Sequence, residues 1–378
     1  MPEFGYYGSM YDESARPWAP DQGFARMMNA LVGGGTNMPR VGFLDGVESL
    51  PVVRTLRLES QLPDIVLNPS VAVFQDRLMV LVRHLTGDPA LGVLVPTKNY
   101  LGEIGSDFTL KNVTPLDDSS AVASLGYRPL YGFEDLRIFV VEGRLMALAA
   151  TARGQSVGYA RATMCLLDLS EGSLRNPRLF QSPRYERNWI PIVDGAGFRL
   201  IYSVAPLIVM GSEAHVPAEA PPGAVLRGSS QAVRWGDGYL AVVHEVAGDH
   251  KHARKIEYTH RFVLFSQDLT TVKIGRPFCF QKRGIEFCAG LAIWNDQGQD
   301  RIMISYGVED RRAYVSEVAD DVVASMLNEA AVVHTLSTVP AASAPVSMVL
   351  AAPIPEKPKS GGGGGGGGRI YGDTSGYP

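Results

Sequence analysis

The sequence predicts an all-β protein, a five-bladed β-propeller, and three observations lead to this fold class. Between about Leu50 and Val333 the chain consists mostly of short β-branched and aromatic runs, which favour strands. One pattern recurs five times: an apolar run, a turn with Gly, Asp or Asn, and a second apolar run, as in a β-hairpin. The first residues after these turns are 67, 54, 41 and 62 residues apart, which leaves room for about four strands per unit. A large β-sandwich with irregular loops would give the same strand signals.

The five expected hairpins follow one another along the chain. In order, they read VAVFQDRLMVLVRH, RIFVVEGRLMALAA, WIPIVDGAGFRLIYSV, QAVRWGDGYLAVVHE and GLAIWNDQGQDRIMISYG. The innermost strands of a propeller surround one axis. Polar residues beside the first strand of each unit should therefore converge there.

One helix is expected after the last hairpin. The segment Val318 to Val333, VADDVVASMLNEAAVV, has an apolar face at helical spacing that consists of Val322, Val323, Met326, Leu327 and Ala330. We expect it to cover the bottom or side of the propeller.

The chain divides into an N-terminal extension (1–49), the propeller (50–335) and a tail rich in Pro, Ala and Gly (336–378). The uncharged stretch Ser337 to Pro355 is long enough to span a membrane, but its four prolines favour an extended linker. Eight consecutive glycines, 361–368, have no side chains to bury, so burial cannot offset the conformational entropy that this segment would lose on becoming ordered. We expect a flexible tail, and Gly/Tyr-rich sequences near both ends leave homo-oligomerisation open.

Composition narrows the function. The formal charge is −4 and no dense Lys/Arg run occurs, so nucleic acid and membrane surfaces are not expected partners. The three cysteines show no metal-type spacing, the seven histidines form no HxH or HExxH group, and no phosphate-binding or dinucleotide-binding glycine motif is present. We therefore predict no metal and no cofactor, and a cytoplasmic protein, because no signal-type apolar segment stands near the N-terminus.

The residues beside the expected inner strands combine acids, bases and aromatics. Carbohydrate chemistry uses this mixture, because an acid protonates a leaving oxygen, cations hold anions, and amides and rings fix sugar hydroxyls. A structural role is the alternative for each residue: Asp135 and Arg137 could form a strand-end ion pair, and His244 could be a core histidine. Recurrence at equivalent places in several units favours a site. The candidates include Asn68, Arg83, Glu134, Asp135, Arg137, Arg187, Asn188, His244, Glu245, Tyr258, His260, Glu286 and Asp310.

Several motifs resemble those of glycoside hydrolase family 130, the mannoside phosphorylases and their relatives. GFEDLRIF is similar to the family's G-x-E-D-P-R-[ILV] signature. In the same order along 65–320, further similar stretches are NPSVAVFQDRLMVLVRH, RNWIPI, YSVAPLIV, YLAVVHE and YGVEDRRAYVSEV. The resemblance implies a five-bladed propeller that acts on a β-mannoside or a related glycoside.

The resemblance also implies roles for single residues. Asp135 would be the general acid, acting through a substrate hydroxyl in an inverting reaction. The phosphate-binding set would be Arg83, Arg187 and His244, with inorganic phosphate as co-substrate. Sugar binding would fall to Asn68, Arg137 and Asp310, and we add Glu134, Asn188, Tyr258 and His260 as further substrate contacts.

The sequence departs from the family at two motif positions. The signature's proline is Leu136 here, and Leu207 replaces a histidine. An added carboxylate, Glu245 or Glu286, could instead activate water, which would make the chain a glycoside hydrolase. The same residues are also compatible with a transferase working in the synthetic direction and with a non-catalytic carbohydrate-binding or assembly module.

Overall fold

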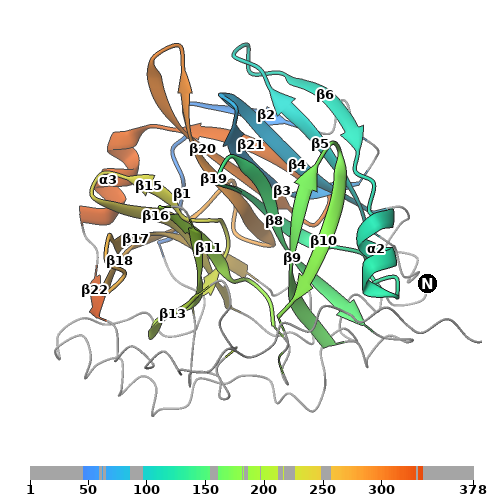
Figure 1. Cartoon of the computed structure of the whole chain (residues 1–378). Coiled ribbons are helices and arrows are strands. Elements are labelled where there is room, and N and C mark those ends of the chain that lie inside the picture. Colours follow the sequence, from blue (N-terminus) through green and yellow to red (C-terminus); the bar gives the residue numbers. More distant parts are fainter. Residues whose placement is uncertain are drawn as a thin grey trace, which may run out of the picture.

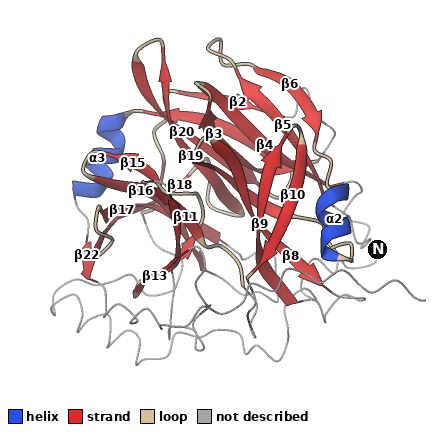
Figure 2. Cartoon of the chain, viewed as in Figure 1, coloured by secondary structure: helices blue, strands red, loops and turns tan. Residues whose placement is uncertain are grey.

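The computed structural model is an all-β, five-bladed propeller (Figure 1). It describes residues 46–58, 62, 65–85, 97–153, 161–180, 182, 186–195, 197–211, 216, 226–247, 257–328 and 331–334. Two short helices, α2 (Ser119–Leu125) and α3 (Asp320–Asn328), flank the sheets on opposite sides of this view (Figure 2). No helix in these ranges has the length and apolar character needed to cross a membrane.

Neighbouring strands of each blade run antiparallel, except β1, which pairs parallel with β18 in blade 4. Blade 1 contains β3 (Val66–Phe74), β4 (Arg77–Leu85), β5 (Thr97–Ile104) and β6 (Leu110–Pro115). Blade 2 contains β7 (Glu134–Val141), β8 (Arg144–Arg153), β9 (Arg161–Ser170) and β10 (Ser173–Leu179). Blade 3 has three strands, β11 (Ile190–Asp194), β12 (Gly197–Val204) and β13 (Leu207–Gly211).

Blades 4 and 5 also take in strands from the start of the described chain. Blade 4 contains β14 (Arg227–Gly228), β15 (Val233–Trp235), β16 (Gly238–Ala247), β17 (Glu257–Ser266) and β18 (Thr271–Cys279), with β1 (Glu48–Ser49) and β22 (Ala331–His334) on β18. Blade 5 contains β19 (Glu286–Asp296), β20 (Gln299–Val308), β21 (Arg312–Val318) and β2 (Arg54–Arg57). The five hairpins predicted from sequence are β3–β4, β7–β8, β11–β12, β15–β16 and β19–β20, so this prediction is confirmed.

Strand β2 closes the ring. It lies near the start of the described chain and pairs antiparallel with β21, which lies near the end of the described chain. In this pairing Thr55 is opposite Ser316. Two side-chain contacts strengthen the closure: Arg54 Nε donates to Glu317 Oε2 (2.6 Å), and the hydroxyls of Thr55 and Ser316 lie 2.8 Å apart. Pairing of this kind fixes the first and last blades against each other.

Five apolar clusters fill the five junctions between neighbouring blades. Blades 1 and 2 share a cluster around Leu81 and Ile138, blades 2 and 3 one around Leu148 and Trp189, and blades 3 and 4 one around Ile192 and Val243. The remaining junctions hold one cluster with Phe262, Leu291 and Ile304 and another with Val80 and Val315. The core is thus a ring of five inter-blade layers, which holds the inner strands at fixed positions.

Helix α3 is shorter than the sequence predicted. It ends at Asn328, and the last part of the predicted helical segment forms β22, which pairs antiparallel with β18. Val323, Met326 and Leu327 are buried against blades 4 and 5, as the apolar face predicted, whereas Ala330 lies outside the described residues. The prediction was wrong at this end because the β-branched run at 332–333 completes the edge of a sheet.

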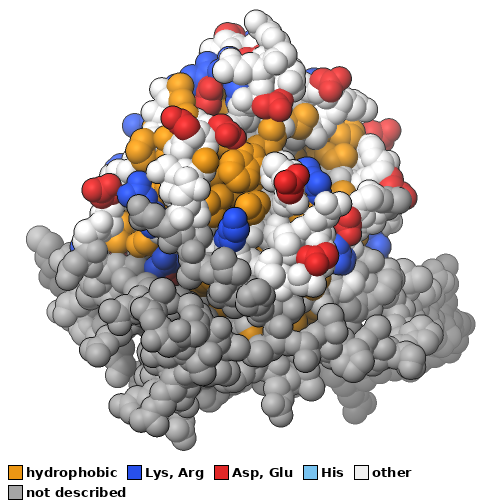
Figure 3. Space-filling view, turned by 90° about the vertical axis from the view of Figure 1, so that its left-hand side faces the viewer, with side chains coloured by type: hydrophobic (Ala, Val, Ile, Leu, Met, Phe, Trp, Pro, Cys, Tyr) orange, Lys and Arg blue, Asp and Glu red, His pale blue; other side chains and the backbone are white. Residues whose placement is uncertain are grey.

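Other sequence predictions fall partly or wholly outside the described ranges. The tail at 336–378 and residues 1–45 of the predicted extension are among them, whereas Glu48–Ser49 pairs parallel with β18. The face on the left of Figure 1, which includes α3, carries acidic and basic side chains intermixed around apolar ones (Figure 3).

Candidate functional site

A network of ion pairs lies at the axis, where blades 1, 2 and 3 meet. Arg83 donates from Nη2 to Glu134 Oε1 (2.5 Å) and from Nη1 to Asp135 Oδ1 (2.8 Å). Arg187 donates from Nη2 to Glu134 Oε2 (2.7 Å), and its Nη1 lies 3.9 Å from Asp135 Oδ2. Each carboxylate therefore contacts both guanidinium groups. We call these four residues the ion cluster.

Bulges in two inner strands bring the polar groups into the cluster. The pairing of β3 with β4 shifts between Leu67 and Ser70, and that of β7 with β8 shifts between Glu134 and Arg137. Within these bulges Asn68 and Asp135 have φ values of 46° and 49°, in the left-handed region that Asn and Asp enter more often than other non-glycine residues. A bulge re-aims side chains out of the regular alternation. Asn68 Nδ2 consequently donates to Asp135 Oδ1 over 2.8 Å.

Arg137 ties the cluster to blades 3 and 4. It is fully buried, donates from Nη1 to the backbone oxygen of Asp135 (3.1 Å) and from Nη2 to Asn188 Oδ1 (2.9 Å), and also donates from Nε to the backbone oxygen of Ser229. Burial lowers its pKa to about 10, an effect that Asp135 partly offsets, so Arg137 is charged at neutral pH. These bonds hold the bulge of β7 that carries Glu134 and Asp135.

The acidity of Asp135 follows from its neighbours. Burial would raise its pKa, but attraction by Arg83 and Arg187, the hydrogen bond from Asn68 and the charge of Arg137 outweigh burial and lower the pKa to about 2. In this arrangement Asp135 is ionised at neutral pH. It can accept a proton only when negative charge is added nearby or the arginines turn to another anion.

Asp310 is a second carboxylic acid beside the cluster, and its pKa moves the other way. Burial raises the pKa, the attraction of Arg83 opposes this, and repulsion by Asp135 and Glu134 adds to it. Asp310 follows β20 with φ 50°, three residues after Gly307, whose α-carbon packs directly against Asn68. Two acids with oppositely shifted pKa values are an arrangement that proton-transfer sites use.

A group of rings lies next to the cluster on the side of blade 4. His244 Nδ1 lies 2.7 Å from Ser229 Oγ, and its ring centroid is 5.5 Å from Tyr258 and 6.4 Å from His260. Burial, with the nearby His260, Arg227 and Arg137, lowers the pKa of His244 well below its usual value. His244 is therefore neutral, and the cations of the predicted phosphate-binding set are the two arginines.

The two predicted extra bases have other partners. Glu245 Oε1 accepts from Arg261 Nε, while Arg261 Nη1 donates to the backbone oxygen of Gly275 (3.0 Å). Glu286 accepts from three successive backbone N–H groups, those of Phe280 (2.6 Å), Gln281 (2.9 Å) and Lys282 (3.0 Å). Glu286 thus holds the turn before its own strand, and neither acid has a direct bond to the ion cluster among these contacts.

Thr97 and Asn99 on β5 support the cluster and were missed by the sequence reasoning. Thr97 Oγ1 accepts from Arg83 Nε (3.1 Å), and Asn99 Nδ2 donates to the backbone oxygen of Phe133, directly before Glu134 (3.0 Å). The residues predicted from the sequence all lie beside the expected inner strands. These two residues lie on the third strand of blade 1, and no pattern in the sequence marks them.

Comparisons with known proteins give matches among solved structures only. No family model matches the sequence, and no curated protein matches it. The chain is similar to β-1,2-mannobiose phosphorylase from Listeria innocua (14% identity over 73% of this chain and 99% of that chain, TM-score 0.47). It is also similar to a mannose phosphorylase from Leishmania mexicana solved with a phosphate ion (15% identity, 68% and 84%, TM-score 0.46).

A third similar structure is described under the GH130 family of mannoside phosphorylases (11% identity, 68% of this chain and 85% of that chain, TM-score 0.47). At these identities and TM-scores the matches assign no activity and no residue role to this chain. The chemistry has to follow from the residues of this chain.

Proposed function

We propose that this chain is a carbohydrate-active enzyme that cleaves or forms β-mannoside-type glycosidic bonds by inverting phosphorolysis. The observation that supports this most is the ion cluster, in which Arg83 and Arg187 meet the Glu134–Asp135 pair at the axis. Guanidinium groups suit a phosphate oxyanion because each presents a planar fork of donors. The mannoside specificity rests on the motif resemblance in the sequence.

Inorganic phosphate would take over the arginine donors that now face Glu134. The two oxygens of Glu134 accept from the Nη2 atoms of Arg83 and Arg187, one from each. A phosphate can present two oxygens to the same pair of donors. Arg187 is the more exposed arginine, with 24% of its side chain accessible against 9% for Arg83, so we assign it the larger movement.

The proton balance follows from the charges. A phosphate oxygen attacks the anomeric carbon, the bond from that carbon to the leaving oxygen breaks, and the leaving oxygen takes a proton. Asp135 has to hold that proton beforehand, although its pKa is about 2 without ligand. Phosphate raises this pKa in two ways, by adding negative charge beside the carboxylate and by drawing the arginines away from it. Asp135 then passes its proton to the leaving oxygen through a substrate hydroxyl, as the motif resemblance implies.

Hydrolysis with Glu245 or Glu286 as the base receives less support. A base for water needs an oxygen free to accept a proton. Glu245 is paired with Arg261, and both oxygens of Glu286 accept backbone N–H bonds. Glu286 would have to give up backbone bonds to act as a base, and Glu245 would have to act while Arg261 holds its Oε1.

The test is phosphate-dependent turnover of a panel of β-1,2-, β-1,3- and β-1,4-linked mannobioses. We expect α-mannose 1-phosphate to form from at least one of them, because a β-linkage inverts in a single displacement. Asp135→Asn should lower turnover by about 10²–10⁴-fold, the usual contribution of general acid catalysis. Asp237→Asn, in the exposed β15–β16 turn, is the matched control and should leave turnover unchanged.

Two outcomes would overturn the proposal. Release of free mannose at a rate independent of phosphate would show a hydrolase. Saturable binding of a mannobiose, with no product from phosphorolysis and none from synthesis, would show a binding module. Full activity of Asp135→Asn would remove Asp135 from the mechanism.

A further inference from the structure

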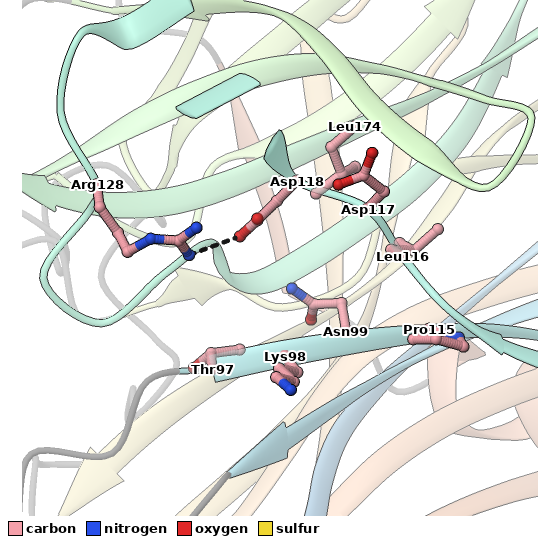
Figure 4. Close-up of a pocket in the computed structure, with 9 residues that line it drawn as sticks. All are labelled: Thr97, Lys98, Asn99, Pro115, Leu116, Asp117, Asp118, Arg128 and Leu174. Atoms are coloured by element: carbon pink, nitrogen blue, oxygen red, sulfur yellow. Dashed lines mark hydrogen bonds and ion pairs between the residues drawn. The ribbon is translucent and has the colours of Figure 1, made fainter. Parts of the chain in front are cut away.

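His244 is the member of the predicted phosphate-binding set that lies outside the ion cluster. Of the other two members, Arg83 is supported by Thr97 on β5, one of the strands that line the pocket in Figure 4. Arg187 is held by its bond to Glu134 (2.7 Å). His244 takes part in neither contact, and a different residue holds its ring.

Ser229 of blade 4 is the residue that holds His244. Its Oγ lies 2.7 Å from His244 Nδ1. Its backbone oxygen accepts from Arg137 Nε, and Arg137 also donates to the backbone oxygen of Asp135 (3.1 Å). A single guanidinium group therefore links Ser229, and through it His244, to the ion cluster.

The Ser229 hydroxyl is the donor in its bond with His244. Ser229 is fully buried, and among the described residues its Oγ has no other partner. If Nδ1 carried the hydrogen, the hydroxyl would be left as a buried donor without an acceptor, which is unfavourable. Burial also keeps the ring neutral, because it lowers the pKa of His244. With Nδ1 accepting, the neutral ring carries its single hydrogen on Nε2.

The Nε2–H group of His244 is open to a ligand. The rings of Tyr258 and Phe287 pack on His244 with centroid distances of 5.5 and 5.3 Å, and neither accepts a hydrogen bond from Nε2. Both ring nitrogens of His260 are enclosed by protein, whereas Nε2 of His244 is not. His244 is only 1% exposed, so the opening admits contact at one atom and not at the face of the ring.

The charges around His244 favour an anionic ligand oxygen. Arg227 lies opposite His244 in the pairing of β14 with β16, so the two side chains leave the same face of the sheet. Arg227 and Arg137 both lower the pKa of His244 by repulsion, so both positive charges act at the ring. Positive surroundings attract a phosphate oxygen more strongly than a neutral sugar hydroxyl.

We propose that Ser229 is a positioning residue for phosphate, which fixes His244 as a neutral Nε2–H donor to one oxygen of the anion. The inference rests on the proposed function, since it takes phosphate as the ligand at the axis. His244 contributes direction and no charge, and the charge of the phosphate is met by Arg83 and Arg187. Ser229 does not touch the ligand and acts only through His244.

Nitrogen NMR of the full chain, labelled with ¹⁵N at histidine, tests the position of the hydrogen. We expect the His244 signals, identified by their loss in His244→Gln, to show hydrogen on Nε2 and none on Nδ1. Ser229→Ala should shift the Nδ1 signal, and Ser229→Thr, which keeps a hydroxyl, should restore it. Ser230→Ala is the matched control, because that buried hydroxyl donates to the backbone oxygen of Gln231 (2.7 Å) and has no bond to His244.

Calorimetric titration with sodium phosphate tests the ligand contact. Ser229→Ala should weaken phosphate binding about fivefold, the size of one ordinary hydrogen bond, and Ser230→Ala should bind as the wild type does. A glutamine amide reaches the position of Nε2, whereas an asparagine amide reaches that of Nδ1. His244→Gln should therefore keep most of the affinity, and His244→Asn should lose about tenfold or more. Methyl β-D-mannoside should bind Ser229→Ala and the wild type equally.

Several results would overturn the inference. Hydrogen on Nδ1 of the wild type is one, and equal phosphate affinity of His244→Gln and His244→Asn is another. Unchanged phosphate affinity in a folded Ser229→Ala, or a loss of mannoside affinity alone, would also overturn it, as would no saturable phosphate binding by the wild type. If Ser229→Ala does not fold, the wild-type spectrum and the two His244 variants decide.

These measurements separate this inference from the proposed function, because none of them requires turnover. Phosphate-dependent cleavage of a mannobiose by a protein with hydrogen on Nδ1 would refute the role of Ser229 alone. Phosphate binding that depends on Ser229, without any phosphorolysis, would support that role and refute the proposed function.

Discussion

His260 is fully buried, yet neither of its ring nitrogens has a hydrogen-bond partner among the described residues. Its ring packs on Phe280 with a centroid distance of 4.6 Å and stacks on Phe278 at 6.0 Å. Burial lowers its pKa to about 3. The unfolded chain protonates this histidine near pH 6.5, so acid favours unfolding.

We expect the free energy of unfolding to fall as the pH drops from 6.5 toward 3, because only the unfolded state gains the proton. At pH 5 the loss from His260 should be about 2 kcal/mol relative to pH 7.5. His260→Phe keeps an aromatic ring and removes the titrating group, so it should lose about 2 kcal/mol less than the wild type over the same interval. Urea denaturation at pH 7.5 and pH 5 measures both proteins. An identical pH dependence in the variant would contradict the assignment.

At the scale of residues, the sequence predicted much of the cluster. Acid–x–Arg and Asn–Pro motifs beside expected inner strands marked Asn68, Glu134, Asp135 and Arg137. In the structure Asn68 donates to the Asp135 side chain, Arg137 donates to the Asp135 backbone oxygen, and Glu134 accepts from Arg83. The protonation states could not be predicted, because they depend on distances and burial that appear only after folding. Their roles in binding and catalysis stay predictions until the turnover experiments are done.

Among the elements, the bulged inner strands depend on close packing at glycines. A Cβ on Gly307 of β20 would lie 2.4 Å from Asn68 Oδ1 and 2.8 Å from Asn68 N. Gly238, at the start of β16, is equally tight, since its Cβ would lie 2.3 Å from the backbone oxygen of Phe265. Gly307 packs against the bulge that contains Asn68, which donates to Asp135. Gly238 lies in the β15–β16 hairpin, which contributes no residue to the ion cluster.

Gly307→Ala and Gly238→Ala form a matched pair. Both should lower the free energy of unfolding by about 1–3 kcal/mol, because both overpack a close backbone contact. Only Gly307→Ala should also lower kcat/KM per folded molecule, by roughly 10²-fold, since a displacement of about 1 Å at a catalytic group has that effect. Thermal unfolding and mannobiose phosphorolysis measure the two quantities. Equal activity of both folded variants would show that Asn68 does not position Asp135.

Hairpins were predictable from sequence because their signals are local. Alternating apolar runs joined by short Gly or Asp turns specify β3–β4 or β7–β8 without reference to the rest of the chain. Strand β22 was not predictable in the same way, since its partner β18 lies about 60 residues earlier and residue preference at 331–334 fits a helix end as well as a strand.

Across the whole molecule, Gln231 joins blades that are distant in sequence. Its Nε2 donates to the backbone oxygens of Val71 in blade 1 (2.5 Å) and Leu291 in blade 5 (2.6 Å), and its Oε1 accepts from Leu291 N (3.3 Å). Ser305 adds a bond from blade 5 to Pro69 in blade 1 (2.6 Å). These contacts join blades 4, 5 and 1 to one another.

Replacement of Gln231 by leucine should destabilise the whole propeller. The substitution leaves two buried carbonyls and one buried N–H without partners, at about 1–3 kcal/mol for each unsatisfied group. We expect a lower Tm and a loss of several kcal/mol in urea denaturation, with a single cooperative transition retained. Gln267→Leu, in the exposed β17–β18 turn, is the control and should change stability little. Equal stability of the two variants would contradict the bridging role.

Ring closure by β2 could not be predicted from the sequence. The number of blades followed from the spacing of hairpins, but the strand that completes blade 5 precedes blade 1 by sequence. Only long-range pairing, Arg54 with Glu317 and Leu56 with Val315, identifies it. Such contacts carry no local pattern of their own.

The bridge made by Gln231 has a consequence for polymeric glycans. Gln231 joins blade 4 to the inner strands of blades 1 and 5, so we expect a polysaccharide not to thread through the ring and only its terminus to reach Asp135. Under the proposed function, we expect the enzyme to shorten or extend a glycan one unit at a time from its end and to leave internal linkages intact.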